Sequence, residues 1–116
     1  MLFERERDAL IDIIENAKAA EEFTTGMTFE AFAVDQKTAY AVVRCLEIIS
    51  EASRRLSSET KARHPDLPWR IIADLGNVYR HSYHRVEPDM VWLTLKDRLG
   101  ALVAACHSEV APPPEV

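Results

Sequence analysis

Apolar residues recur every three or four positions along the first half of the chain, which is the spacing of an amphipathic α-helix. The pattern predicts a first helix over residues 4–24, ended by Gly26. A short helical turn is expected at residues 28–32. Asp35 then opens the clearest helix of the chain, which the pattern extends over residues 36–56.

The second half of the chain also shows helical spacing of its apolar residues, after a polar connection. Residues 57–65 form that connection, with room for one helical turn, and the next helix is expected over residues 69–84. Pro88 suits the first turn of a last helix, which runs to about His107. Three consecutive prolines follow, so residues 111–116 are predicted to be a disordered tail.

These patterns predict one helical domain over residues 1–110. No internal repeat, strand-like alternation or linker divides the chain, so the predicted fold class is all-α, an up-and-down bundle of four to five helices. The positions expected to face the core are Leu10, Ile13, Ile14, Ala17, Phe29, Phe32, Ala39, Val42, Val43, Leu46, Ile49, Ala52, Leu56, Ile71, Ile72, Leu75, Val78, Met90, Val91, Leu95, Leu99, Leu102 and Val103.

Composition and charge narrow the functional classes. With 116 residues, 47% of them hydrophobic, the chain supports one packed core. Its net charge of −5 argues against a general DNA or RNA coat, so any contact with RNA must be local and no DNA partner is expected. No apolar segment resembles a signal peptide or a membrane span, and Cys45 and Cys106 lack a redox or metal spacing. A cytoplasmic protein with reduced thiols is expected.

The densest polar cluster falls at the end of the third long helix, in residues 76–85. There Asn77, His81 and His84 share one helical stripe, with Arg80 one step around the cylinder. Two interpretations are equally supported. Histidine and arginine residues interact favourably with a helix C-terminus, which is a purely structural role. Alternatively, an imidazole beside a guanidinium can cleave RNA without a metal ion.

Symmetric dimerisation would strengthen the catalytic interpretation, because two copies of one histidine across a twofold axis provide both a base and an acid. A zinc site is the competing chemical hypothesis, with His81 and His84 joined by His64 or His107. It is much less favoured, since no acidic or thiol ligand falls at a recognisable metal spacing. We therefore expect neither a metal ion nor any other cofactor.

The sequence is similar to the HepT-like family of the HEPN superfamily over about residues 4–106. The resemblance rests on several strings: residues 29–32 (FEAF), 35–38 (DQKT), 43–52 (VRCLEIISEA) and 68–73 (PWRIIA), together with Asn77, His81, Ser82, Tyr83, Val91 and Trp92.

This resemblance implies a five-helix HEPN-type protomer, a homodimer with the motif in a cleft at the interface, and metal-independent endoribonuclease activity on RNA. It also implies the role of toxin in a type VII toxin-antitoxin system. The expected antitoxin is an MNT-type nucleotidyltransferase that places AMP on the motif tyrosine, which corresponds to Tyr83. Asn77 and His81 match the motif, and His81 would act as acid or base.

One motif position departs from the family pattern. Gly76 stands where the family has an arginine that steadies the phosphate. Arg80, Arg85 and Arg44, with His84, are the candidates to replace it, although Arg80 points about 100° away from His81 on an ideal helix. The alternative function is a catalytically impaired HEPN domain that dimerises and binds a nucleotidyltransferase or a nucleotide. A helical interaction module without a ligand is the third hypothesis.

Overall fold

The computed structural model describes the backbone of residues 4–81 and 87–110, and the side chains of residues 4–75 and 87–110. All regular structure in these ranges is helical, which confirms the all-α fold class. The elements are α1 (Glu4–Phe23), α2 (Phe29–Ala33), α3 (Gln36–Arg54), α4 (Ser58–Ala62), α5 (Trp69–His81), α6 (Pro88–Leu93), the π-helical turn η1 (Thr94–Arg98) and α7 (Leu99–Val110). The predicted disordered tail, residues 111–116, lies outside the described residues.

Local capping explains where the helices of the first half begin and end. Gly26 adopts φ +75°, a backbone conformation that other residues rarely take, and so turns the chain after α1. Thr28, Asp35 and Ser57 each accept a hydrogen bond from the backbone amide three residues on, at the starts of α2, α3 and α4. Backbone and side-chain hydrogen bonds from Thr38 lower the pKa of Asp35. The predicted starts of α2 and α3 are therefore confirmed, and the helical turn for which residues 57–65 had room is α4.

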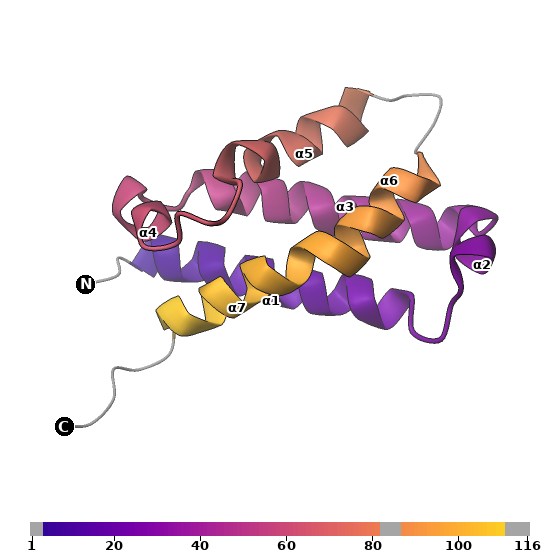
Figure 1. Ribbon diagram of the computed structural model, residues 1–116, viewed down its shortest axis with the longest axis horizontal. Helices are drawn as coiled ribbons and strands as arrows, with labels where there is room; N and C mark the ends of the chain where they lie inside the picture. The colour runs from indigo at the N-terminus through magenta and orange to yellow at the C-terminus, as the bar shows by residue number, and fades with distance from the viewer. Residues whose placement is uncertain (1–3, 82–86, 111–116) are drawn as a thin grey trace.

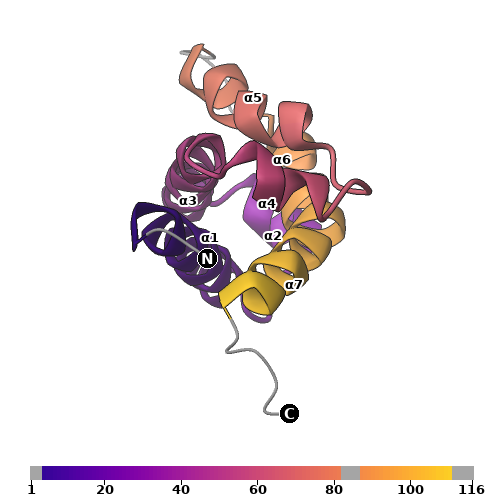
Figure 2. The ribbon, with the colours of Figure 1, turned by 90° about the vertical axis from the view of Figure 1, so that its left-hand side faces the viewer.

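The long helices run up and down the molecule (Figure 1). α1 and α3 form the most extensive pair, α5 packs against α3, and α7 packs against α1. Figure 2 shows the elements end-on, with α5 displaced to the outside of α3. One continuous core lies between the helices; its largest fully buried residues include Leu10, Ile13, Phe32, Val42, Leu46, Ile49, Val91, Leu99 and Leu102.

Two residues that the pattern assigned to the core are exposed, and this part of the prediction was wrong. Ile71 is 51% exposed and Met90 is 47% exposed. Each precedes a buried residue, Ile72 or Val91, and therefore points about 100° away from it. α5 contacts mainly α3, so only a narrow stripe of α5 is covered, and Ile71 falls outside it.

The last helix is interrupted, whereas the pattern predicted one continuous α-helix. In η1 the amide of Leu99 donates to the carbonyl of Thr94, five residues earlier. The buried series Val91, Leu95, Leu99 advances in two consecutive steps of four residues. Each such step drifts about 40° around an α-helix, and a wider turn removes the drift. The π-turn thus keeps all three side chains in the core.

None of the helices in the described ranges combines the length and apolar character needed to span a lipid bilayer.

Candidate active site

The backbone of α5 carries the first part of the predicted motif. α5 remains helical through Asn77 and His81, which are four positions apart and so lie on one face of the helix. The side chains of Asn77, Arg80 and His81 lie outside the described residues, and so do Tyr83, His84 and Arg85. Their predicted roles therefore remain predictions, and what the structure describes is how α5 is held.

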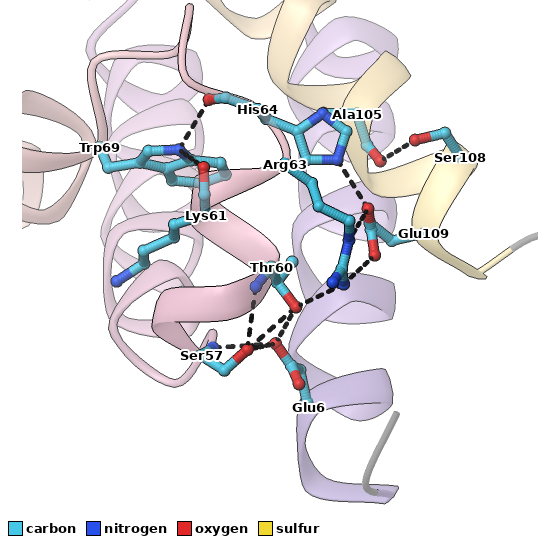
Figure 3. A network of polar contacts seen from close by, with 10 residues as sticks. All are labelled: Glu6, Ser57, Thr60, Lys61, Arg63, His64, Trp69, Ala105, Ser108 and Glu109. Carbon is cyan, nitrogen blue, oxygen red and sulfur yellow. Dashed lines mark hydrogen bonds and ion pairs between the residues drawn. The ribbon is translucent and has the colours of Figure 1, made fainter. Parts of the chain in front are cut away.

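At its start α5 is fixed by Trp69. The indole Nε1 donates to the backbone carbonyls of Lys61, at 3.2 Å, and His64, at 3.0 Å. Figure 3 shows this contact beside the polar network that surrounds α4. α5 therefore begins at a defined position relative to α4.

Glu6 lies at the centre of that network, although it belongs to the charged first turn of α1. Its Oε1 accepts hydrogen bonds from the amide of Ser57, at 2.8 Å, and from the hydroxyls of Ser57 and Thr60, at 2.9 and 2.5 Å. Burial raises the pKa of Glu6, but these hydrogen bonds and the charge of Arg63 outweigh it, and the net pKa is lowered. Glu6 thus joins α1 to α4 (Figure 3).

Glu109 of α7 closes the same network from the other side. It accepts hydrogen bonds from Arg63 at 2.7 and 3.1 Å and lies 2.7 Å from Nε2 of His64. The hydrogen bond from Arg63 lowers the pKa of Glu109 despite partial burial, and His64 adds to this effect. Since the imidazole of His64 is engaged with Glu109, its role in the described structure is to tie the segment just after α4 to α7. Among the described side chains, no group of three His, Cys, Asp or Glu residues could hold a metal ion.

A second attachment holds α5 in its middle. The carbonyl of Ala73 accepts a hydrogen bond from Ser50 Oγ at 2.7 Å and another from the Arg54 guanidinium at 2.6 Å. Both donors belong to α3, and Ala73 lies one helical turn before Asn77. We call this arrangement the Ala73 clamp. It fixes the position of α5 along α3 immediately before the motif.

The clamp also shows where Arg44 lies relative to the motif. α3 and α5 run in opposite directions (Figure 1), so residues before Ser50 lie level with residues after Ala73. Arg44 is six residues before Ser50 and His81 is eight after Ala73, which places them about 9 and 12 Å from the clamp in the same direction. The Arg44 side chain is 67% exposed and pairs with Glu47 at 3.3 Å.

The two cysteines are buried and unreactive by environment. Burial raises the pKa of Cys45 and raises that of Cys106 to about 12. A thiol with a raised pKa holds little thiolate at neutral pH, and the thiolate is the nucleophilic form. Cys45 is a small core residue, only 5% exposed.

The model of the family described as "Ribonuclease HepT-like" matches residues 13–108, a range that contains all of α5. The chain belongs to this HepT-like ribonuclease family. The resemblance found in the residues is thereby confirmed.

Individual relatives agree with this assignment. A Thermococcus cleftensis protein named "Probable ribonuclease HepT" is 41% identical over 96 residues, covering 83% of this chain and 87% of its own. A Methanocaldococcus jannaschii relative, named as a candidate RNase, is 38% identical over 74% of this chain and 71% of its own. A third relative, from Caldanaerobacter subterraneus, is also named as a candidate RNase. It is 34% identical over 96 residues, which cover 83% of this chain and 86% of its own. No solved structure matches the chain.

In this HepT-like chain, the motif on α5 was predicted from the sequence, but the residues that hold α5 in place were not. Ser50 was the available signal, because it is a polar residue within the apolar series of α3. Glu6 was a second signal, since it continues the buried stripe of Leu10 and Ile13 at helical spacing.

Proposed function

We propose that this protein is the toxin of a type VII toxin-antitoxin system and that it cleaves RNA, with tRNA among its substrates, without a metal ion. One observation carries the proposal: the HepT-like match extends over residues 13–108 and so includes Asn77, His81 and Tyr83. These are the residues that the resemblance assigns to catalysis and to its control.

The proposed reaction uses His81 as a general base. Its imidazole removes the proton from a ribose 2′-hydroxyl, the 2′-oxygen forms a bond to phosphorus, and the bond from phosphorus to the 5′-oxygen breaks. The leaving 5′-oxygen takes a proton from the protonated His81 of a second protomer. Asn77 orients the phosphate or the imidazole. The reaction balances with two histidines and requires no redox partner.

A cation must still stabilise the charge that develops on the phosphate, because Gly76 has no side chain to do so. Arg44 is the candidate whose side chain is described. It is exposed, lies level with the end of α5, and is engaged only by an exposed ion pair, which stabilises the fold little. Arg80, Arg85 and His84 are the other candidates.

We place the homodimer interface on the outer face of α5. An apolar groove with a cavity of about 350 Å³ runs between α5 and the last helix, lined by Ile71, Leu75 and Leu102 among others. Asp97 and Arg98 lie at this groove. Opposite charges within one patch can pair across a twofold axis, and so satisfy the self-complementarity that a symmetric interface needs. A dimer on this face covers the exposed Ile71.

The proposed antitoxin is an MNT-type nucleotidyltransferase that transfers AMP to Tyr83. The modified tyrosine would stand two residues beyond His81. An added phosphate repels the RNA backbone and an added nucleoside fills the cleft. Both effects exclude the substrate without changing His81.

Cleavage of total cellular RNA in EDTA tests this function. Wild-type protein, His81→Ala and Gly76→Arg are compared. We expect the wild type to cleave and His81→Ala to be inactive, with Gly76→Arg faster than wild type. Removing one such donor typically costs about a hundredfold in rate, which sets the size of the gain available to Gly76→Arg. Loss of all activity in both wild type and Gly76→Arg would refute the nuclease.

Gly76 also favours a second function, a catalytically impaired HEPN domain that dimerises and binds the nucleotidyltransferase or a nucleotide. This function predicts an inert wild type, while Gly76→Arg gains cleavage. It also predicts that expression of the wild type alone leaves growth unaffected, whereas an active toxin slows growth in a manner that depends on His81. Co-purification with the nucleotidyltransferase is expected in both cases, so RNA cleavage and growth are the measurements that decide.

A further inference from the structure

The first two turns of α3 expose an aromatic ring between two cations. Tyr40 is 58% exposed, and its hydroxyl accepts a hydrogen bond from Gln36 Nε2 at 3.1 Å. Lys37 and Arg44 are also exposed, three residues before Tyr40 and four after it. Residues at these spacings lie on one face of a helix. We call Lys37, Tyr40 and Arg44 the α3 strip.

The strip differs in charge from the rest of the protein. The chain carries a net charge of −5, yet two of the three side chains in the strip are cationic. Arg44 forms an ion pair with Glu47 at 3.3 Å. Lys37 takes part in none of the ion pairs among the described residues. Exposed ion pairs contribute little to stability, so a phosphate can replace Glu47 at small cost. The charge of the strip therefore complements a polyanion.

The position of the strip connects it to the motif. The Ala73 clamp sets Ser50 opposite Ala73, and the strip lies on the N-terminal side of Ser50. Because α3 and α5 are antiparallel, this is the direction in which α5 runs toward His81 (Figure 1). Arg44 is level with the last turn of α5, and Tyr40 lies about 6 Å further on. An RNA strand bound at the end of α5 would continue along this part of α3.

The chemistry of the three side chains fits single-stranded RNA. An exposed aromatic ring stacks on any base, and flanking cations hold the backbone phosphates. Lys37 and Arg44 are about 10 Å apart along the helix axis, which leaves Tyr40 between them for a base. We propose that the α3 strip binds single-stranded RNA next to the scissile site, with Tyr40 stacking on a base and Lys37 and Arg44 contacting phosphates. The proposal rests on the proposed function, because it takes RNA as the ligand.

Binding can be separated from cleavage in the His81→Ala background. The probe is a fluorescein-labelled decamer oligoribonucleotide of mixed sequence, titrated in EDTA at several salt concentrations. Tyr40→Ala, Tyr40→Phe, Lys37→Ala and Arg44→Ala are added one at a time. Lys18→Ala, which removes an exposed lysine of α1, is the control.

We expect Tyr40→Ala to weaken binding about tenfold, while Tyr40→Phe, which keeps the ring, binds like the parent. Lys37→Ala and Arg44→Ala should each reduce the dependence of log affinity on log salt by about 0.7, the slope for one phosphate contact on a single strand. Lys18→Ala should change neither quantity. Equal affinity of Tyr40→Ala and the parent, or no binding of the probe, overturns the proposal.

The outcome also separates this proposal from the nuclease function. If wild type cleaves RNA and Tyr40→Ala has an unchanged KM, the strip fails and the nuclease stands. If the probe binds in a manner that depends on Tyr40 but wild type never cleaves, the nuclease fails and the strip stands. If Tyr40→Ala alters sedimentation but not RNA affinity, this face contacts protein and the proposal is wrong.

Discussion

At the scale of single residues, Glu6 shows how a charged position can belong to the core. It is only 7% exposed and occupies the helical stripe that continues through Leu10 and Ile13. Three hydrogen bonds from α4 satisfy its carboxylate. A charge buried in this way stabilises the fold only together with its partners. Glu6 is therefore the residue through which the start of α1 holds α4.

Glu6→Ala is expected to lower the free energy of unfolding by about 2 kcal/mol or more, because it removes three hydrogen bonds and leaves the Thr60 hydroxyl buried without its acceptor. Glu4→Ala, at an exposed position in the same turn, is the matched control. It should change the free energy of unfolding by less than about 0.5 kcal/mol. Urea denaturation measures both. Equal effects of the two substitutions would contradict the structural role of Glu6.

The lowered pKa of Glu6 makes stability depend on pH in the acidic range. A carboxyl whose pKa is lower in the folded state stabilises the fold fully above its ordinary value of 4.5, and this contribution is lost as the pH falls through the folded pKa. The free energy of unfolding of wild type should therefore decrease below about pH 4.5. In Glu6→Gln the decrease should be smaller, with the parts due to Asp35 and Glu109 remaining. Parallel pH profiles for both proteins would show that Glu6 titrates normally.

At the scale of elements, the Ala73 clamp determines how firmly the motif helix is held. Ser50→Ala removes one of the two donors to the Ala73 carbonyl and should cost about 1 kcal/mol of stability. It should also speed amide hydrogen exchange in α5. Ser53→Ala is the matched control, since the Ser53 hydroxyl is equally buried but bonds to a carbonyl of its own helix. Unchanged exchange in α5 for Ser50→Ala would show that the clamp does not hold this helix.

The π-turn η1 is expected to tolerate the deletion of one residue. In η1 the hydrogen bond spans five residues instead of the four of an α-helix, so removing the exposed Asp97 leaves a regular α-helical turn there and keeps the helix on either side in register. The variant should still unfold cooperatively, with a melting temperature close to that of wild type. Deleting the exposed Glu51 in the regular helix α3 rotates everything after it by about 100° and should abolish cooperative unfolding. Circular dichroism during heating compares the two; equal damage would contradict the role assigned to η1.

At the scale of the whole molecule, the exposed groove beside α5 tests the proposed dimer. Sedimentation should show a dimer of the wild type at micromolar concentration. Ile71→Lys places a charge in the apolar groove and should shift the protein to monomer. Val34→Lys, at an exposed apolar position after α2, is the control and should leave the dimer intact. A wild-type monomer would remove the composite cleft, and a dimer unaffected by Ile71→Lys would place the interface elsewhere.

Over the whole molecule, much of the fold was predictable because the interactions that set the helices are local. Helical periodicity, the caps Thr28, Asp35 and Ser57 and the turn at Gly26 act within a few residues of sequence. Local interactions of this kind are set by the sequence before any helix meets another. For that reason the all-α class and the starts of the helices were predicted correctly. The HepT-like motif strings are also local, and they identified the family.

Other features depend on which helices contact one another, and only the tertiary structure decided them. The exposure of Ile71 follows from α5 having its main contact on one side only, and η1 lies where the successive buried residues Val91, Leu95 and Leu99 meet the core. The hydrogen bonds of Glu6 and of the Ala73 clamp join residues that are nineteen or more positions apart in the sequence. Periodicity shows that a helix has an apolar face but not what covers it, because covering depends on the position of the neighbouring helices.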